Sequence, residues 1–197
     1  MGLVVGFEGL PGCGKTTVIG LLIRALEALR LRATAVDIDT SRYAPALRAI
    51  ADALPIQNMA RSMMYWSMRI LQYDAIDRMR GGMDVIFADR TWGTALAFDG
   101  WGNGVARDAL EHIGKFLRAP DITFFLRVPL AVARARKSSR TMADPDFARR
   151  VEHGYECLAA RHGWIPVDAE RTPEQVKEYC FEIIRARMAG KTAVVSS

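Results

Sequence analysis

A single α/β domain, in which a five-stranded parallel sheet is covered by helices on both faces, is the fold that this sequence predicts. Short apolar runs alternate along the chain with longer segments whose apolar residues recur at helical spacing. The apolar runs are continuous, which is typical of strands buried on both faces of a parallel sheet. The predicted strands are Leu3–Phe7, Thr34–Ile38, Asp84–Ala88, Ile122–Val128 and Trp164–Val167.

The segments between these strands have the signals of helices. After the first strand, apolar residues at helical spacing are Val18, Leu21, Leu22, Leu26 and Leu29. A long helix begins near Asn58 and ends at Gly81-Gly82, since glycine suits a helix C-terminus. No internal repeat or linker interrupts the chain. We therefore expect one domain over residues 1–190, with a short lid near 136–148 and a loose tail over 191–197.

The composition is that of a globular protein with anionic partners. Half of the 197 residues are hydrophobic and a quarter are charged, which excludes a disordered chain. The net charge of +5 favours nucleotides or nucleic acid, but no basic and aromatic cluster supports nucleic acid. There is no long apolar run or basic-flanked leader, so we expect a cytoplasmic protein without a membrane partner. Three widely spaced cysteines indicate reduced thiols, without a disulfide or a cysteine metal site.

The first helix is preceded by a glycine-rich loop, Gly9-Leu10-Pro11-Gly12-Cys13-Gly14-Lys15-Thr16, with the spacing GxxxxGK[ST]. Glycines allow backbone N–H groups to surround phosphate oxygens, and the start of the helix adds its positive end. Lys15 is expected to reach the β- and γ-phosphates, and the Thr16 hydroxyl to bind Mg²⁺. The alternative is a glycine-rich turn with a surface lysine. The strand before the loop and the helix after it favour a nucleoside triphosphate site.

A second candidate group, Asp89 and Arg90, follows the predicted strand Asp84–Ala88. Open α/β sheets bind ligands at the carboxyl ends of their strands, and both residues lie there. A carboxylate at this place orders Mg²⁺ and its waters, and an arginine holds phosphoryl oxygens. The alternative is a helix-capping aspartate beside a surface arginine. No NKxD guanine motif occurs, so a kinase is favoured over a GTPase.

The sequence resembles the thymidylate kinase family of P-loop nucleoside monophosphate kinases over nearly its whole length. Phe7 to Thr17 matches the family's FEGxxGxGKTT, and its DR(Y/H)xxSxxAYQG segment is similar to "DRTWGTALAFDG". Further similar segments are "PDITFFLRVPLAVARAR", "FARRVEHGY" and "VDAERTPEQV". The resemblance implies the three-layer P-loop kinase fold with a lid, ATP as phosphoryl donor with Mg²⁺, and transfer to dTMP in the cytoplasm. It also implies a homodimer.

The resemblance and the residue chemistry together give the candidate site. Tyr65 and Arg69 lie one helical turn apart, so a ring that stacks on a base is beside a donor to a base carbonyl. The alternative for Tyr65 is a core stripe with its apolar neighbours. Other acceptor candidates are Asp39, Arg42, Arg48, Thr94 and Phe98. The catalytic candidates are Lys15, Asp89, Arg90 and the lid arginines Arg134, Arg136 and Arg140. Donor phosphate or adenine candidates are Gly9, Leu10, Pro11, Gly12, Cys13, Gly14, Lys15, Thr16, Thr17, Asp168 and Ala169, and Mg²⁺ candidates are Thr16 and Asp89.

Several positions depart from the family pattern and affect the choice of acceptor. Pro11 stands where many members carry an acid, and the loop "DIDTSRYAPALR" replaces REPGGT. Other departures are Leu71, Ala95, Asp99 and Arg127. Because an unpaired polar group in a site discriminates strongly, Pro11 and the changed loop favour one alternative to a dTMP kinase, a kinase for a modified nucleotide, a nucleoside or another small hydroxyl compound. A second alternative is a nucleotide sensor without transfer activity, but the retained Lys15, Thr16, Asp89 and Arg90 argue against it.

Overall fold

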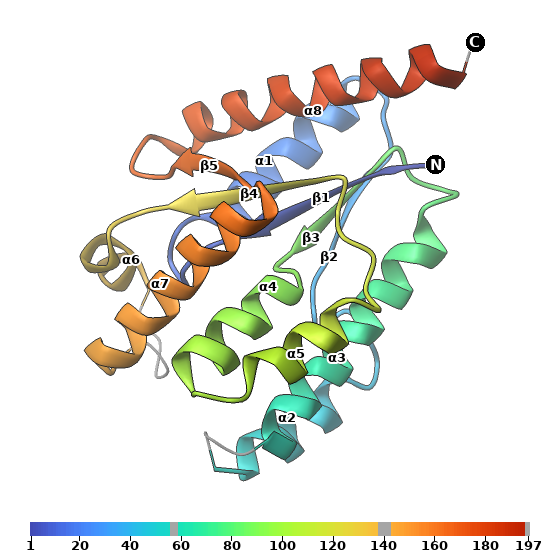
Figure 1. The fold of residues 1–197 in the computed structure, drawn as a ribbon. Coiled ribbons are helices and arrows are strands. Elements are labelled where there is room, and N and C mark those ends of the chain that lie inside the picture. Colours follow the sequence, from blue (N-terminus) through green and yellow to red (C-terminus); the bar gives the residue numbers. More distant parts are fainter. Residues whose placement is uncertain (56–58, 138–142, 196–197) are drawn as a thin grey trace.

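The computed structural model describes residues 1–55, 59–137 and 143–195, with side chains up to residue 190. A five-stranded, all-parallel sheet lies at its centre, with strand order β2-β3-β1-β4-β5 (Figure 1). The strands are β1 (Leu3–Glu8), β2 (Ala33–Val36), β3 (Val85–Asp89), β4 (Ile122–Arg127) and β5 (Ile165–Asp168). The predicted fold class is confirmed.

Strand β1 is the middle strand, and all six of its residues are buried. Its neighbours β3 and β4 run parallel to it, and Phe7 pairs with Asp89. Because parallel strands end at the same edge of a sheet, this register brings the loop that follows β1 beside the loop that follows β3. The two candidate groups of the sequence, 80 residues apart, are thereby placed together.

Helices cover both faces of the sheet. Helices α1 (Lys15–Ala28) and α8 (Pro173–Val195) lie side by side on one face (Figure 1). On the other face lie α3 (Met59–Met79), α4 (Trp92–Ala95), the π-helix η1 (Leu96–Gly102), α5 (Arg107–Gly114) and α7 (Pro145–His162). Helix α2 (Ala44–Ala53) packs on α3, and α6 (Leu130–Arg136) follows β4. No helix in the described part of the chain is long and apolar enough to span a bilayer.

The core contains the apolar residues that the strand prediction used. Phe7, Phe87 and Phe124 are fully buried and stack across three adjacent strands, with ring centroids 5.3 and 6.0 Å apart. Burying a large apolar side chain contributes about 1.5–3 kcal/mol, so this row holds the central strands in register. The strands that carry the site are therefore those held by this buried row.

Most predicted strand ends differ from the structure by one residue, and two boundaries differ by more. Strand β2 ends at Val36 rather than Ile38, because Asp37 folds the chain into a turn in which its Oδ1 accepts from Asp39 N at 2.9 Å. Helix α8 continues to Val195, through the range where a loose tail is predicted, since one glycine in a helix costs only about 1 kcal/mol. In the predicted lid, residues 145–148 form the first turn of α7, and 138–142 lie outside the described residues.

Candidate active site

The loop between β1 and α1 has the shape of an anion site. Gly9 and Gly12 have φ angles of 138° and 88°, which side chains rarely adopt. A Cβ atom at Gly9 would lie 2.6 Å from the Leu126 carbonyl oxygen, and one at Gly12 would lie 2.3 Å from that of Ala133. Only glycine fits at either position. Gly14 precedes α1, so the N–H groups of the first helical turn remain open to a cavity of about 860 Å³.

Lys15 is buried within this loop. Its Nζ donates to the carbonyl oxygens of Gly9 and Leu10, at 2.9 and 3.0 Å. Burial, followed by the charge of Arg90, lowers the pKa of the Lys15 ammonium. A phosphate group in the cavity would oppose both effects, because it supplies negative charge to a cation held away from water.

Thr16 and Asp89 meet at the edge of the same cavity. The Thr16 hydroxyl donates to Asp89 Oδ2 at 2.7 Å, and both residues line the cavity. One comes from the first turn of α1 and the other from the end of β3, so the pairing of β1 with β3 brings them together. The structure thus gathers two oxygen donors beside the loop.

Arg90 has a left-handed backbone with φ of 71°, which is uncommon for a residue with a side chain. Its N–H donates to Phe7 O at 3.0 Å. Its carbonyl oxygen accepts from Arg69 Nη1 at 3.0 Å and from Gln72 Nε2 at 3.1 Å. These three bonds hold the strained backbone, and such strain persists where the surroundings fix it, often at functional sites. The guanidinium lines the cavity and is 3.4 Å from Gly9 O.

Glu8 is a fully buried carboxylate at the end of β1. It accepts four hydrogen bonds from the segment after Arg90: from the N–H and hydroxyl of Thr91 at 2.7 and 2.6 Å, and from the N–H and hydroxyl of Thr94 at 3.0 and 2.6 Å. The Tyr155 hydroxyl, on α7, lies 2.9 Å from the Thr94 hydroxyl. Glu8 therefore holds in place the segment that follows Arg90 in the chain.

A second cavity, of about 290 Å³, adjoins the first. It is lined by aromatic rings and by buried polar groups from α3 and η1. These residues include Tyr65, Arg69, Thr94, Phe98, Asp99 and Asn103. Arg69 is 3% exposed, and its Nε has no hydrogen-bond partner among the described residues. Burial lowers the pKa of the Arg69 guanidinium. An apolar cleft with a few convergent polar groups is the usual form of a small-molecule site.

The two cavities share four residues, Pro11, Ile38, Arg90 and Lys137. Two of the four are cations, and they come from opposite sides: Arg90 from the end of β3 and Lys137 from the end of α6. The Cβ of Lys137 lies close to Gly12, since a Cβ atom placed on Gly12 would be 3.2 Å from the Cβ of Lys137. Positive charge is thus concentrated where one cavity opens into the other.

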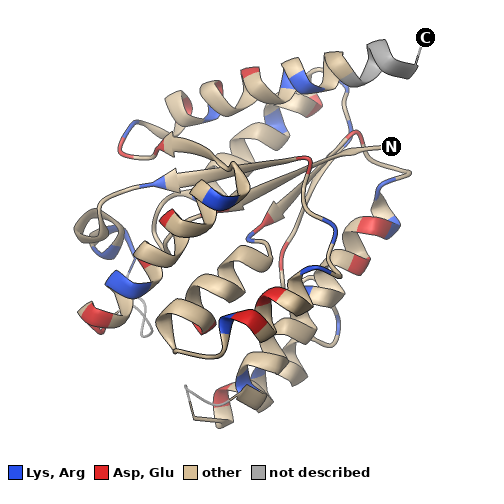
Figure 2. Ribbon diagram, viewed as in Figure 1, with Lys and Arg blue, Asp and Glu red and all other residues tan. Residues whose placement is uncertain are grey.

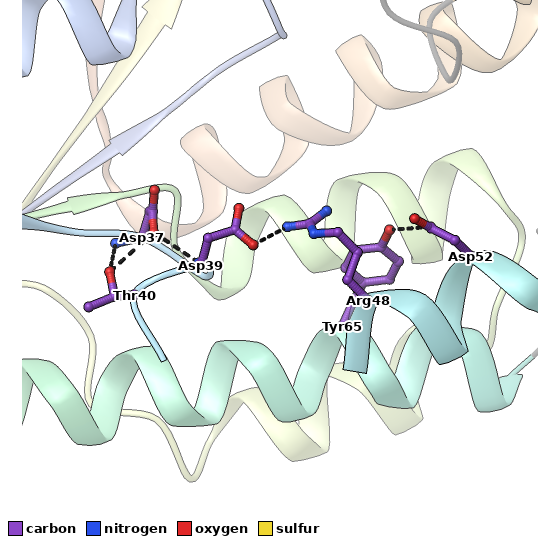
Figure 3. Close-up of polar contacts among 6 residues, drawn as sticks. All are labelled: Asp37, Asp39, Thr40, Arg48, Asp52 and Tyr65. Atoms are coloured by element: carbon purple, nitrogen blue, oxygen red, sulfur yellow. Dashed lines mark hydrogen bonds and ion pairs between the residues drawn. The ribbon is translucent and has the colours of Figure 1, made fainter. Parts of the chain in front are cut away.

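The loop and helix after β2 contribute a chain of polar contacts (Figure 3). Arg48 donates to Asp39 at 2.5 Å, and the Tyr65 hydroxyl donates to Asp52 Oδ1 at 3.0 Å. The guanidinium groups of Arg48 and Arg61 both lie over the ring of Tyr65, at 5.9 and 5.4 Å from its centroid. Arg48 and Asp39 line the larger cavity, whereas Tyr65 lines the smaller one. Arg48 of α2 thus lies at the larger cavity, and Asp52 of α2 holds the hydroxyl of Tyr65, which lines the smaller one.

The chain is similar in sequence to known proteins over most of its length. The family model described as thymidylate kinase matches residues 7–179. A thymidylate kinase of Synechococcus sp. (strain WH7803) is 30% identical over 207 residues, covering 95% of each chain. A probable thymidylate kinase of Pyrobaculum aerophilum is 30% identical over 191 residues, covering 92% of this chain and 95% of the other. The chain belongs to the thymidylate kinase family. Membership implies a transferase with ATP as phosphoryl donor and a nucleotide as second substrate.

Most of the residues predicted from the sequence lie in or beside the two cavities. Those that line the larger cavity are Pro11, Gly12, Cys13, Gly14, Lys15, Thr16, Thr17, Asp39, Arg48, Asp89, Arg90, Arg136 and Ala169. Those that line the smaller one are Pro11, Tyr65, Arg69, Arg90, Thr94 and Phe98. The Thr94 hydroxyl is engaged with Glu8, which the family resemblance alone did not indicate.

Other predicted residues lie elsewhere. Arg42 is exposed and donates to the Tyr43 hydroxyl at 2.6 Å. Arg134 of α6 is exposed and donates to Ala143 O at 3.0 Å. Leu10 and Asp168 line a third cavity, on the β4–β5 side, where Asp168 pairs with Arg171 at 3.2 Å. Basic positions do occur on α6 and α7, as Figure 2 shows, but Arg140 lies outside the described residues.

Three site residues were not identified from the sequence: Glu8, Asp99 and Lys137. For Glu8 there was a local signal, since an acid ends a strand that is otherwise apolar and two threonines follow Arg90. Asp99 was noted only as a departure from the family pattern. Lys137 was one of several basic residues in the lid segment, and nothing local distinguishes it from its neighbours.

The Glu8 network predicts a large effect of a small change. Glu8→Gln replaces one acceptor oxygen by an NH₂ group that faces the N–H and O–H donors of Thr91 and Thr94. We expect the free energy of unfolding to fall by about 2–4 kcal/mol, measured by urea denaturation. The matched control is Glu182→Gln on the exposed face of α8, which should change it by less than about 0.5 kcal/mol. A similar small change in both variants would contradict the role given to Glu8.

A substitution of Asp99 should raise the free energy of unfolding rather than lower it. Burial raises the pKa of the Asp99 carboxyl to about 6, against the Asn103 hydrogen bond and the charges of Arg61 and Arg69. Above pH 6 the folded protein holds an ionised group that is more stable in the unfolded chain. Asp99→Asn should therefore raise the free energy of unfolding at pH 7 by about 1–3 kcal/mol. The gain should shrink as the pH falls from 6 to 4, because wild-type Asp99 then takes up its proton. Urea denaturation at pH 7 and pH 4.5 measures both values, and a gain independent of pH would exclude this cause.

Proposed function

We propose that this chain transfers the γ-phosphoryl group of ATP to dTMP, giving dTDP and ADP. The observation that carries the proposal is the pair of adjoining cavities with two cations at their junction. The larger contains the P-loop and fits the triphosphate, and the smaller fits a nucleoside monophosphate. The curated relatives are named thymidylate kinases, which supports dTMP as the acceptor.

The donor phosphates would lie against the P-loop. The N–H groups of the α1 start and the Lys15 ammonium face the cavity and supply positive charge at its floor. Ala169, at the end of β5, and Arg136, which donates to Ala169 O at 2.8 Å, line the far side of this cavity. We infer that the adenine lies near Ala169 and Asp168, with Arg136 directed to the phosphates on nucleotide binding.

Magnesium fits the donor set of this site. The Thr16 hydroxyl and Asp89 carboxylate are hard oxygen donors, 2.7 Å apart, at the edge of the phosphate cavity. In the described part of the chain no group of three or more His, Cys, Asp or Glu side chains could hold an ion. Mg²⁺ suits this, since it is commonly held by one or two protein oxygens together with phosphates and water. When bound, it would neutralise charge on the β- and γ-phosphates.

The acceptor nucleotide would be held by α3, η1 and the loop after β2. Tyr65 would stack on the base, Arg69 would donate to a base carbonyl oxygen, and Phe98 would pack on the sugar side. Arg90 and Arg48 would hold the acceptor phosphate, since both guanidinium groups line the cavity where that phosphate must meet the donor. Arg48 is paired with Asp39, so the phosphate would displace or share this partner.

The transfer step needs little from the protein beyond position and charge. An oxygen of the acceptor phosphate forms a bond to the γ-phosphorus while the bond from that phosphorus to the β–γ bridging oxygen breaks, leaving ADP. Charge develops on the transferred group between the two cavities. Arg90 and Lys137 are placed there, and we include Lys137 among the catalytic residues for this reason. The roles of Arg134 and Arg140 remain predictions from the sequence.

A kinase for a different acceptor is the second candidate. The observation that favours it is that Pro11, Ala95 and Asp99, which depart from the family pattern, all line the acceptor cavity. Homodimer formation and a cytoplasmic location complete the proposal, on the family resemblance and the composition of the sequence. An acceptor panel distinguishes the two candidates.

The proposed function is tested by ADP release from Mg²⁺–ATP with dTMP, dUMP, dCMP, thymidine and small hydroxyl compounds. We expect dTMP to give the highest kcat/KM. Lys15→Ala should lower it by more than about 10²-fold, whereas Lys115→Ala, on an exposed helix end, should not change it. Turnover of another compound in preference to dTMP would favour the second candidate. ATP binding without turnover of any compound would support a sensor.

Lys137 gives a separate prediction. If its charge acts on the transferred group, Lys137→Ala should lower kcat by about 10²-fold and leave the KM values for both nucleotides within about threefold. Lys137→Arg should retain most of kcat, because it keeps the charge. A loss of ATP binding with kcat unchanged would instead make Lys137 a ground-state phosphate ligand.

A further inference from the structure

The acceptor cavity contains a buried carboxylate that the phosphoryl-transfer chemistry does not use. Asp99 is 7% exposed and lines the cavity of about 290 Å³ together with Tyr65 and Arg69. It belongs to η1, a seven-residue π-helical segment. Such segments are rare and occur frequently at functional sites, since the wider turn changes which side chains face a cavity. A buried charge is costly to retain unless it is paired or serves a function.

The hydrogen bond that Asp99 accepts from Asn103 leaves its carboxylate with capacity for a ligand. Asn103 Nδ2 donates to Asp99 Oδ1 at 3.3 Å, which is long. A carboxylate can accept about four hydrogen bonds. Burial raises the pKa of the Asp99 carboxyl to about 6, so at pH 7 the ionised form predominates, and this form only accepts hydrogen bonds. A group that only accepts selects a ligand that donates.

Arg69 supplies the complementary group. Its Nη1 donates to Arg90 O, and its buried Nε has no hydrogen-bond partner in the described part of the chain. The cavity therefore presents a cationic donor, Arg69, and an anionic acceptor, Asp99, to the same bound ligand. A carbonyl oxygen, with two lone pairs, suits the planar donor fork of arginine better than a ring nitrogen with one.

Pyrimidine bases differ in the edge that would meet this pair. Thymine and uracil present a carbonyl oxygen at C4 and an N–H at N3. Cytosine presents an amino group at C4 and an unprotonated N3. With the C4 carbonyl on Arg69, N3–H points toward an acceptor, whereas cytosine in the same position would place a lone pair against a carboxylate. The pair thus matches an imide edge and opposes cytosine.

We propose that Asp99 is the residue that selects the base: it accepts a hydrogen bond from N3–H of thymine or uracil, beside Arg69 on the C4 oxygen. This inference rests on the proposed function, since it takes the smaller cavity as the nucleotide acceptor site. It assigns the specificity to the π-helix η1 rather than to the P-loop.

The test is the variant Asp99→Asn. Asn103 would hold the oxygen of the new amide, so its NH₂ group would face the cavity and donate where Asp99 accepted. We expect Kd and KM for dTMP to rise by about 10- to 100-fold and those for dCMP to fall by at least about 10-fold. Isothermal titration gives Kd without ATP, and ADP release gives KM. Asp108→Asn, the same change at an exposed position of α5, should leave both nucleotides unaffected.

A double variant tests the geometry of the swap. In Asp99→Asn/Asn103→Ala the amide is free to turn its oxygen toward N3–H, so dTMP affinity should recover by at least about threefold relative to the single variant. Circular dichroism confirms that each variant is folded.

The outcomes separate this inference from the proposed function. A wild type that turns over dTMP, with a single variant that changes dTMP and dCMP by the same factor or changes neither, would overturn only the role of Asp99. A wild type that prefers dCMP would also overturn it, while leaving a nucleotide kinase. If the wild type phosphorylates none of the monophosphates, the proposed function is contradicted. In that case titration still tests Asp99, because equal affinities of the wild type for dTMP and dCMP would overturn the inference as well.

Discussion

The arrangement of the site depends on the Glu8 carboxylate. It is fully buried at the end of the middle strand, and its four hydrogen bonds all go to the segment that follows β3. A buried charge without partners would be strongly destabilising, so the segment after β3 is held where those donors can reach Glu8. Arg90 lies between this segment and the strand, with its own N–H on Phe7 O. The strained φ of Arg90 is therefore set from both sides, and its guanidinium faces the P-loop.

The same region concentrates several buried cations close to one another. Lys15 and Arg69 are buried, and burial lowers the pKa of each, with Arg90 as a further cause in both cases. Glu8 and Asp89 offset part of this charge, but Glu8 is already saturated by neutral donors. The free protein thus holds repulsion that a nucleotide would relieve, since its phosphates bring the missing negative charge. Binding should stabilise the fold for that reason, and the cations need little movement to receive the ligand.

The parts of the site that could be predicted from the sequence are those whose chemistry is local. The P-loop carries its glycines, Lys15 and Thr16 in eight consecutive residues, and the strand before it identifies the sheet edge. Asp89 and Arg90 follow from the same rule about strand ends. Glu8, Lys137 and Asp99 did not, because each acquires its role from segments far away in the chain. Glu8 needs Thr91 and Thr94, and Lys137 needs the contact of α6 with Gly12. Asp99 faces the cavity from a π-helix, a rare element that no local signal in the sequence indicated.

The difference between the residues that could be predicted and those that could not has a physical basis, which also bears on the choice of substrate. Transfer chemistry requires fixed charges, and these lie at the ends of buried strands, where β1 and β3 are held by the aromatic row and by Glu8. The proposed base site is lined by α3 and η1 instead, which pack on the sheet through side chains. Arg69 and Gln72 of α3 also hold the Arg90 carbonyl oxygen, so these two residues are tied to the phosphate site. Pro11, Ala95 and Asp99 all depart from the family pattern and all line the acceptor cavity. These three departures lie on the wall that contacts the proposed acceptor, whereas Lys15, Asp89 and Arg90 at the phosphate cavity match the family pattern.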